Sequence, residues 1–269
     1  GFIVGDHGTI LRSTDKGVNW QNLNSGTDQQ LNAVYFLDSL RGFAAGNNIF
    51  LKTMDGGETW VKVSIPDHFW KTICFADSLV GYIAGGEGKL YKTVDAGENW
   101  TAITSGTLFQ INSLACPTVS KIYAVTEGGE VLKSVNKGLN FTKIEDRDSA
   151  LNSIYFLDSL TACAVGVQGI VIKTTDEGLT WQTFSQANVW YGFFHVFFNE
   201  NRIGFAVDYG GYIYKTLNEG ETWTKGNSLA TAFKGGCFIS NQSGFIVGAG
   251  GRIFKTTSTG NSWSKVNKT

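Results

Sequence analysis

The octet TMDGGETW, at residues 53–60, belongs to a set of seven similar octets along the 269-residue chain. In every copy the first residue is Ser or Thr, the fifth is Gly, and the eighth is Trp or, once, Phe. The copies are STDKGVNW at 13–20, TMDGGETW at 53–60, TVDAGENW at 93–100, SVNKGLNF at 134–141, TTDEGLTW at 174–181, TLNEGETW at 216–223 and TTSTGNSW at 256–263. Successive copies start 40, 40, 41, 40, 42 and 40 residues apart. This spacing indicates one repeated structural unit.

Four strand-like segments surround each octet. In the second copy they are NAVYFLD, GFAAG, IFLKT and TWVKV, with turn residues between them, and the octet lies between the third and the fourth. Short apolar segments separated by turns every 8 to 12 residues are typical of an antiparallel meander. Four strands in about 40 residues are typical of a β-propeller blade. We therefore predict an all-β, seven-bladed β-propeller of four-stranded antiparallel blades, with the octet at each turn between strands three and four.

The repeat also predicts the blade boundaries within a single propeller domain, residues 1–269. The expected blades are 1–30, 31–68, 69–108, 109–149, 150–188, 189–229 and 230–269. Residues 1–30 provide only the second, third and fourth strands, so we expect the first blade to lack its innermost strand in this range. Sequence outside the range would supply that strand; the alternative is a gap in the ring.

The composition agrees with short strands and excludes several functions. Glycine is abundant (34 residues) and proline scarce (2 residues), as expected for many tight turns and few helices. The formal net charge of -1 gives no reason to expect nucleic acid or an acidic membrane as partner, and no apolar run is long enough to span a membrane. Cysteines 74, 116, 163 and 237 form no C-x-x-C pair. We expect buried free thiols, with a disulfide between neighbouring strands as the alternative, and no metal or cofactor.

The octet itself is predicted to be structural, because seven near-copies spread round a ring cannot single out one catalytic site. Its third residue can accept hydrogen bonds from amides of its own turn. Its glycine suits a positive φ, and its aromatic residue can wedge between strands or blades. The residues concerned are Asp15, Trp20, Asp55, Trp60, Asp95, Trp100, Asn136, Phe141, Asp176, Trp181, Asn218, Trp223, Ser258 and Trp263.

The pattern [ST]-x-[DN]-x-G-x-x-[WF] resembles the Asp-box, or bacterial neuraminidase repeat. With VG-x-x-G-x-I-x-K/R-T ahead of it, as in residues 4–14 and 247–257, the unit is similar to the photosystem II stability/assembly-factor-like family. The resemblance covers nearly the whole chain. It implies a non-catalytic propeller in an extracytoplasmic place (periplasm, secreted, cell surface or a compartment like the thylakoid lumen). It also implies that any functional site lies on the face away from the Asp-boxes.

That opposite face would carry the loops that enter the first strand and those between the second and third strands. Exposed aromatic residues with polar neighbours suit peptide or sugar binding. The candidate binding residues there are His68, Phe69, Trp70, Phe109, Arg147, Trp190, Tyr191, Tyr209 and Phe233. For Trp70 the alternative is a core position, because it aligns with Leu31 and Leu151 in the repeat. His195 aligns with strand residues Ala33 and Ser153, so a hydrogen-bonded structural role is favoured for it.

The sequence gives less support to an enzyme than to a binding protein. A sialidase needs an arginine triad, and of the five arginines only Arg147 falls on the candidate face. Another glycoside hydrolase would need two paired carboxylates; Asp67 and Asp208 are candidates, but the sequence does not pair them. We therefore expect no catalytic residues and a binding or scaffold propeller with a protein or peptide partner, which could be other domains of a larger chain. The alternatives are a carbohydrate-binding or glycoside-hydrolase-like propeller, with a glycan partner, and a structural module of a larger secreted surface protein.

Overall fold

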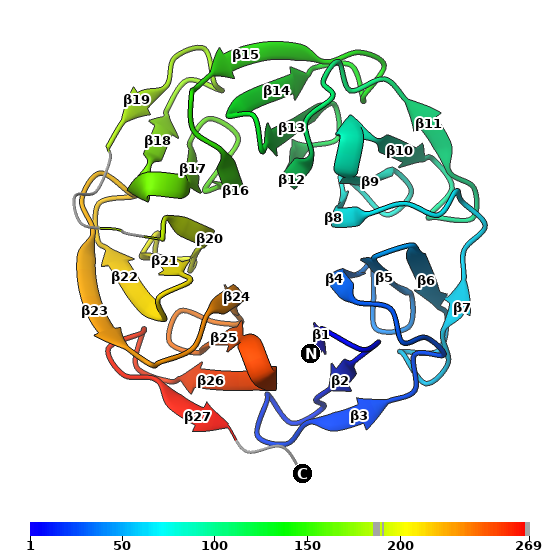
Figure 1. The fold of residues 1–269 in the computed structure, drawn as a ribbon, viewed down its shortest axis with the longest axis horizontal. Coiled ribbons are helices and arrows are strands. Elements are labelled where there is room, and N and C mark those ends of the chain that lie inside the picture. The colour runs from blue at the N-terminus through cyan, green and yellow to red at the C-terminus, as the bar shows by residue number, and fades with distance from the viewer. Residues whose placement is uncertain (185–188, 190, 267–269) are drawn as a thin grey trace. The chain divides into compact units, whose positions relative to one another are not determined.

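The computed structural model describes residues 1–184, 189 and 191–266. Their strands form seven antiparallel sheets, each with its strands in chain order (Figure 1). Six sheets have four strands and the first has three. The prediction of a seven-bladed β-propeller, with a first blade that lacks its innermost strand in this range, is therefore confirmed. The chain divides into two compact units, and the division passes through the fourth sheet.

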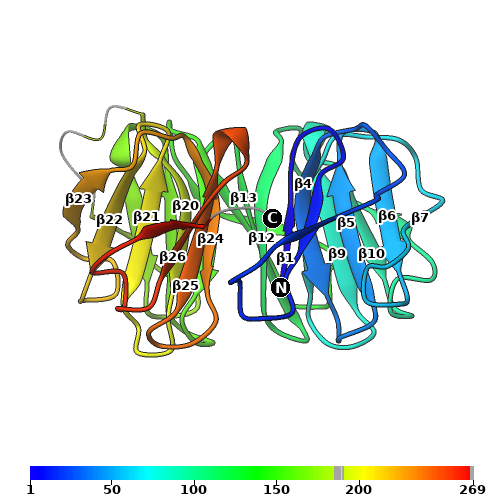
Figure 2. The same cartoon turned by 90° about the horizontal axis from the view of Figure 1, so that it is seen from below.

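The first unit comprises, among the described residues, Gly1–Ala124 and Leu132–Lys143. The strands of the first three sheets, all in this unit, lie side by side with turns at two ends, as Figure 2 shows for β4 to β7. They are β1 (Phe2–Val4), β2 (Ile10–Arg12) and β3 (Gln21–Leu23); β4 (Leu31–Phe36), β5 (Gly42–Gly46), β6 (Ile49–Thr53) and β7 (Val61–Lys62); β8 (Trp70–Phe75), β9 (Gly81–Gly85), β10 (Leu90–Thr93) and β11 (Thr101–Ile103). The fourth sheet is β12 (Ile111–Thr118), β13 (Lys121–Thr126), β14 (Glu130–Ser134) and β15 (Thr142–Asp146).

The second unit comprises the described residues of 125–131 and 144–266. Its three complete sheets are β16 (Leu151–Phe156), β17 (Ala162–Gly166), β18 (Val171–Thr174) and β19 (Gln182–Thr183); β20 (Phe193–Phe198), β21 (Gly204–Asp208), β22 (Tyr212–Thr216) and β23 (Thr224–Ser228); β24 (Phe233–Phe238), β25 (Gly244–Gly248), β26 (Arg252–Thr256) and β27 (Ser264–Val266). Three 3-10 turns, η1 (Gly86–Gly88), η2 (Val167–Gly169) and η3 (Ala249–Gly251), connect second to third strands in the described chain.

The sequence of each strand follows from its place in the blade. The second strands β5 (GFAAG) and β17 (ACAVG) are buried along their whole length, and they carry only glycine and apolar residues. The outer strands β7 and β19 are fully exposed and polar or mixed. A strand that is covered on both faces can carry a continuous apolar run, whereas an exposed edge cannot.

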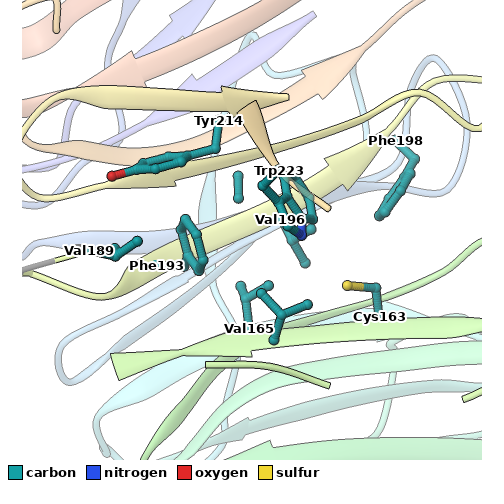
Figure 3. Close-up of a cluster of buried hydrophobic side chains, with 10 residues drawn as sticks. Cys163, Val165, Val189, Phe193, Val196, Phe198, Tyr214 and Trp223 are labelled. Atoms are coloured by element: carbon teal, nitrogen blue, oxygen red, sulfur yellow. The ribbon is translucent and has the colours of Figure 1, made fainter. Parts of the chain in front are cut away.

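The core lies between neighbouring sheets rather than inside any one of them. Figure 3 shows one such cluster, in which Cys163 and Val165 of β17 face Phe193 and Val196 of β20 and the ring of Trp223. A single sheet cannot bury both of its faces, so each blade depends on its neighbours for its hydrophobic stabilisation.

In several copies the octet glycine lies directly against an aromatic ring of the preceding sheet. A Cβ atom built on Gly97 would lie 2.2 Å from Cζ of Phe43, which belongs to the second strand of the preceding sheet. The same relation holds between Gly57 and Phe2, and between Gly260 and Phe205. Glycine is therefore required at this position for two reasons. The backbone has a positive φ (+84° at Gly97), and an aromatic ring lies where a side chain would be.

A basic residue at the end of each third strand adds a second link between sheets. It reaches the octet of the following sheet within each unit. Arg12 pairs with Glu58 (2.6 Å), Lys52 with Glu98, and Lys173 with Glu221 (2.9 Å); Lys92 Nζ donates to the carbonyl of Lys137 (2.6 Å), and Lys215 Nζ to that of Thr259 (2.9 Å). In the three ion pairs the basic side chain is largely buried and the glutamate is exposed, so solvent screening of the glutamate limits the stability that each pair contributes.

The cysteines differ from expectation at three positions. Cys74 of β8 and Cys116 of β12 form a disulfide between the first strands of neighbouring sheets, so the alternative interpretation is correct for this pair. Cys163 is a buried free thiol, as expected, and burial raises its pKa to about 12. Cys237 is free but exposed. The pairing of Cys74 with Cys116 depends on the packing of two separate blades, and a linear sequence does not contain that distance.

Replacing the glycine that lies against Phe43 tests this packing between sheets. Gly97→Ala should lower the free energy of unfolding by about 2–5 kcal/mol, since it combines an unfavourable φ with overpacking. Gly26→Ala is the matched control, because Gly26 also has a positive φ (+72°) but a Cβ there would meet no atom within 4 Å. Denaturant titration compares the two. Equal losses would show that the close approach of the ring contributes nothing.

Removing the disulfide should also destabilise the protein. Cys74→Ala/Cys116→Ala, or a reductant acting on the parent, should cost about 2–4 kcal/mol because the closed loop restricts the unfolded chain. Thermal melts with and without dithiothreitol measure this effect. The variant Cys237→Ala should retain the full sensitivity to reductant. A parent protein that melts alike in both conditions would contradict the disulfide's role.

Candidate functional site

The Asp-box turns are built around the buried hydroxyl group of the first octet residue. In the second copy, Thr53 Oγ1 accepts a hydrogen bond from the amide of Gly57 (2.9 Å) and donates to Asp55 Oδ1 (2.8 Å). The glycine-to-hydroxyl bond occurs in all seven copies, at 2.8 to 3.0 Å. This hydroxyl was not among the predicted structural groups, although its restriction to Ser or Thr in every copy was a usable signal.

The third octet residue closes the turn from the other side. Asp55 accepts from both the amide (3.0 Å) and the hydroxyl (2.6 Å) of Thr59. Asn136 and Asn218 accept the equivalent amide bonds, at 3.2 and 3.0 Å, and Ser258 accepts one at 3.1 Å. A neutral oxygen can replace the carboxylate because the turn needs an acceptor and not a charge.

The carboxylates that are present are strongly stabilised in their ionised form. Hydrogen bonds from the seventh octet residue, followed by the hydroxyl of the first, lower the pKa to about 2. This holds for Asp15, Asp55, Asp95 and Asp176. A carboxylate with a lowered pKa, whose two oxygens already accept hydrogen bonds within its own turn, is a poor general base. The Asp-box is therefore a structural turn.

The aromatic eighth residue fills the space beside the turn. The indole nitrogens of Trp60, Trp100 and Trp223 donate to the carbonyl of the octet glycine, at 3.1, 3.2 and 2.9 Å. The ring of Trp100 packs edge-on against Phe43 and Phe50 of the preceding sheet, with centroids 6.0 and 5.2 Å apart. It therefore packs between two blades.

The candidate binding residues of the first unit divide into exposed and buried. Phe109 is 52% exposed, whereas Trp70 is only 1% exposed and lies in the core edge-on to Tyr91. The core position that its alignment with Leu31 and Leu151 favoured is therefore the correct one, and Trp70 does not belong among the binding candidates, because a ring that fills the space between sheets cannot meet a partner. His68 Nε2 donates a 2.8 Å hydrogen bond to the carbonyl of Gly86, and Phe69 pairs with Asn47 in a β-bridge.

In the second unit, Tyr191 and Tyr209 are exposed (66% and 43%). Phe233 is fully buried, which corrects the expectation for it, since the first residue of each inner strand points into the core. Arg147 pairs with Glu145 at 2.7 Å and donates to Thr183 Oγ1 at 3.1 Å, so its charge is already used within the unit. Trp190 lies outside the described residues.

Asp67 and Asp208, the two carboxylates considered for a glycoside hydrolase, each interact with different groups of the protein. Asp67 forms an ion pair with Lys62 (2.8 Å). Asp208, only 2% exposed, accepts from the amide of Tyr212 (2.8 Å) and the hydroxyl of Tyr214 (3.2 Å). Burial raises the pKa of Asp208. The two belong to different units, and the hydrogen bonds of Asp208 hold the turn between β21 and β22.

His195 lies against neutral groups at both ring nitrogens. Nδ1 lies 3.1 Å from Ser153 Oγ, and Nε2 lies 3.2 Å from the carbonyl of Gly236. Burial lowers the pKa of this histidine, so the neutral form is favoured. Ser153 Oγ also accepts from the amide of Val196 (3.3 Å), and this arrangement links β16 to β20 structurally.

A cavity lies at the Asp-box end of the second unit. It measures about 320 Å³, and its lining includes Tyr155, Phe198, Phe238 and Arg202. Arg202 is neutralised by Asp158 (2.7 Å) and Glu219 (2.6 Å). The cavity therefore presents aromatic rings to a ligand, and the charge of Arg202 is already neutralised by the two carboxylates.

Within the described ranges, no three His, Cys, Asp or Glu residues gather closely enough to hold a metal ion. Nor does any helix in that part of the chain have the length and apolar character needed to cross a membrane.

Seven repeated turns on seven sheets define the class of the protein as an Asp-box β-propeller. Residues 1–257 match the family described as photosynthesis system II assembly factor YCF48. The chain belongs to this family, and the resemblance drawn from its octets is confirmed. Among curated proteins, we found no match to the chain.

Solved structures show the same fold at low sequence identity. The chain is similar to YCF48 bound to D1 peptide, with 17% identity, a TM-score of 0.73, and coverage of 88% of this chain and 82% of that one. It is similar to YCF48 from Cyanidioschyzon merolae (14%, TM-score 0.72, coverage 88% and 85%). It is also similar to an ancestral GH74 enzyme (15%, TM-score 0.72), covering 98% of this chain but only 44% of that one.

The lowered pKa values predict a loss of stability in acid. Each of the four Asp-box carboxylates has a folded pKa of about 2, below its value of 3.8 in the unfolded chain. Their contribution is therefore complete above about pH 4 and is lost as the pH falls towards 2. Denaturant titrations between pH 5 and pH 2.5 should show this decline.

The control is the quadruple variant Asp15→Asn/Asp55→Asn/Asp95→Asn/Asp176→Asn. Asn already stands at this third octet position in two copies, as Asn136 and Asn218. The stability of the variant should fall less steeply over the same interval. An identical decline in parent and variant would assign the acid sensitivity to other carboxylates.

Proposed function

We propose that this protein is a non-catalytic binding propeller, comparable to an assembly factor, that engages a peptide segment of a partner protein. The observation that carries the proposal is membership of the YCF48 family over residues 1–257, together with the similar fold of a YCF48 with a bound D1 peptide. The low identity transfers the fold and not the partner, so the identity of the peptide is left to experiment.

We place the binding surface away from the Asp-boxes, at the other ends of the sheets. Every Asp-box side chain described above is engaged in holding its own turn or the neighbouring sheet. At the opposite end of the second unit, by contrast, Tyr191 and Tyr209 present large rings to solvent. Tyrosine contributes apolar area and a hydroxyl group at low entropic cost, which suits it to anchor a peptide.

We also propose an extracytoplasmic location. The disulfide between Cys74 and Cys116 supports it, because such bonds persist mainly in oxidising compartments. The separate engagement of Asp67 and Asp208 supports a non-catalytic role, since neither carboxylate is available to act with a second one across a substrate.

A random-peptide display selection on the purified protein tests the proposal. Peptides should be enriched, and Tyr191→Ala/Tyr209→Ala should weaken their binding about tenfold or more, as for interface anchors. Fluorescence anisotropy measures the affinities, and a thermal melt should show an unchanged midpoint. Leu179→Ala, which removes a 79% exposed side chain at the Asp-box end, is the control and should bind as the parent does.

Failure to enrich any peptide would refute peptide binding. Equal affinity of the parent and the double tyrosine variant would place the site elsewhere on the molecule.

A further inference from the structure

The second residue of the inner strand is Asn in β4, β12 and β16, but Lys71 replaces it in β8, Phe194 in β20 and Lys234 in β24. Two of these asparagines link neighbouring sheets: Asn32 Nδ2 donates to the carbonyl of Trp70 (2.8 Å), and Asn152 Nδ2 to that of Phe193 (2.7 Å). Phe194 and Lys234 have no amide side chain. A position that abandons a stabilising interaction of the repeat is a candidate for selection by function.

Phe194 and Lys234 form a compact group with Tyr209 instead. The rings of Phe194 and Tyr209 meet edge to face, with centroids 5.0 Å apart and planes at 77°. Lys234 Nζ lies over both rings, 5.1 Å from the Phe194 centroid and 4.7 Å from that of Tyr209. The ammonium group is therefore positioned by two aromatic faces.

The group continues across the turn between β21 and β22. A Cβ atom on Gly210 would lie 3.1 Å from Tyr191 and 3.3 Å from Tyr212, so these two rings flank the bare backbone of the glycine. Lys225 Nζ lies 3.6 Å from the centroid of Tyr212. We call Tyr191, Phe194, Tyr209, Tyr212, Lys225 and Lys234 the tyrosine–lysine surface.

The charge on this surface is not neutralised by an ion pair. Both lysines are exposed, and neither forms an ion pair with a carboxylate of the described chain. The nearby Asp208 is buried, accepts hydrogen bonds from Tyr212 and Tyr214, and interacts electrostatically with Lys225 without forming an ion pair. By contrast, Lys52 and Lys173 pair with glutamates. Two positive charges beside exposed rings complement an anionic group that also carries apolar surface.

We propose that the tyrosine–lysine surface binds an acidic segment of the partner protein, whose carboxylates meet Lys225 and Lys234 while an aromatic or aliphatic side chain lies against Tyr191 and Tyr209. This inference rests on the proposed peptide-binding function and specifies the chemistry of the peptide. An acidic polysaccharide would share the anionic character and is separated from a peptide by the test.

The test compares two synthetic peptides of equal shape. One is fluorescein-labelled Gly-Glu-Phe-Asp-Tyr-Glu-Phe-Gly, and the other replaces each acid by its amide, as Gly-Gln-Phe-Asn-Tyr-Gln-Phe-Gly. The parent protein should bind the acidic peptide at least about tenfold more tightly than the amide peptide, and the preference should shrink as salt is raised. Lys225→Gln/Lys234→Gln should abolish the preference, and Lys234→Arg should retain most of it.

The control is Lys137→Gln, which removes an exposed lysine in the octet of the fourth sheet and should leave both affinities unchanged. Melting temperatures verify that each variant is folded. Equal binding of the two peptides, or an unchanged preference in the double lysine variant, would overturn the acidic-segment inference while leaving peptide binding intact. Absence of binding to both peptides, or lysine-dependent binding of hyaluronan oligosaccharides in their place, would also overturn it. Failure of the peptide selection described above would separately refute the proposed function.

Discussion

The fold depends on the close approach of the octet glycine to the preceding sheet. At Gly97 the backbone has a positive φ and lies against the ring of Phe43, so no side chain fits there. The hydroxyl of Thr93 fixes the same glycine through its amide at 2.9 Å. One short turn thereby connects the third strand to the fourth and packs the sheet against its neighbour. A single sheet cannot bury its own faces, so the rest of the packing between sheets depends on this contact between the octet turn and the preceding sheet.

This arrangement explains why the acidic residue of the octet is dispensable. The turn needs an oxygen acceptor at the third residue, and Asn136, Asn218 and Ser258 each provide one in the same frame. The hydroxyl of the first residue and the glycine do not vary in the same way, because no other side chain supplies a buried hydroxyl at that distance or leaves room for the aromatic ring. Function has to be sought where the repeat is interrupted, as at Phe194 and Lys234.

The candidate binding residues illustrate what alignment of the repeats reveals and what it leaves open. Trp70 and Phe233 begin inner strands, and both are buried between sheets, although aromatic residues near a loop also suit a surface. Alignment with Leu31 was the correct indication for Trp70. Tyr191 and Tyr209 are exposed because they lie in connections outside the strands. The disulfide could not be foreseen either, since 42 residues separate Cys74 from Cys116 and only the packing of two sheets brings them together.

The sequence by itself determined the number of blades, the strand order within each blade, the missing strand of the first blade and the place of every Asp-box turn. These features follow from local periodicity and turn chemistry, which short stretches of chain encode. Only the tertiary structure decided which aromatic residues are buried, which cysteines pair, and that Lys234 lies over Phe194 and Tyr209. Those facts depend on the packing of residues from different strands or blades, and a linear pattern does not contain those distances.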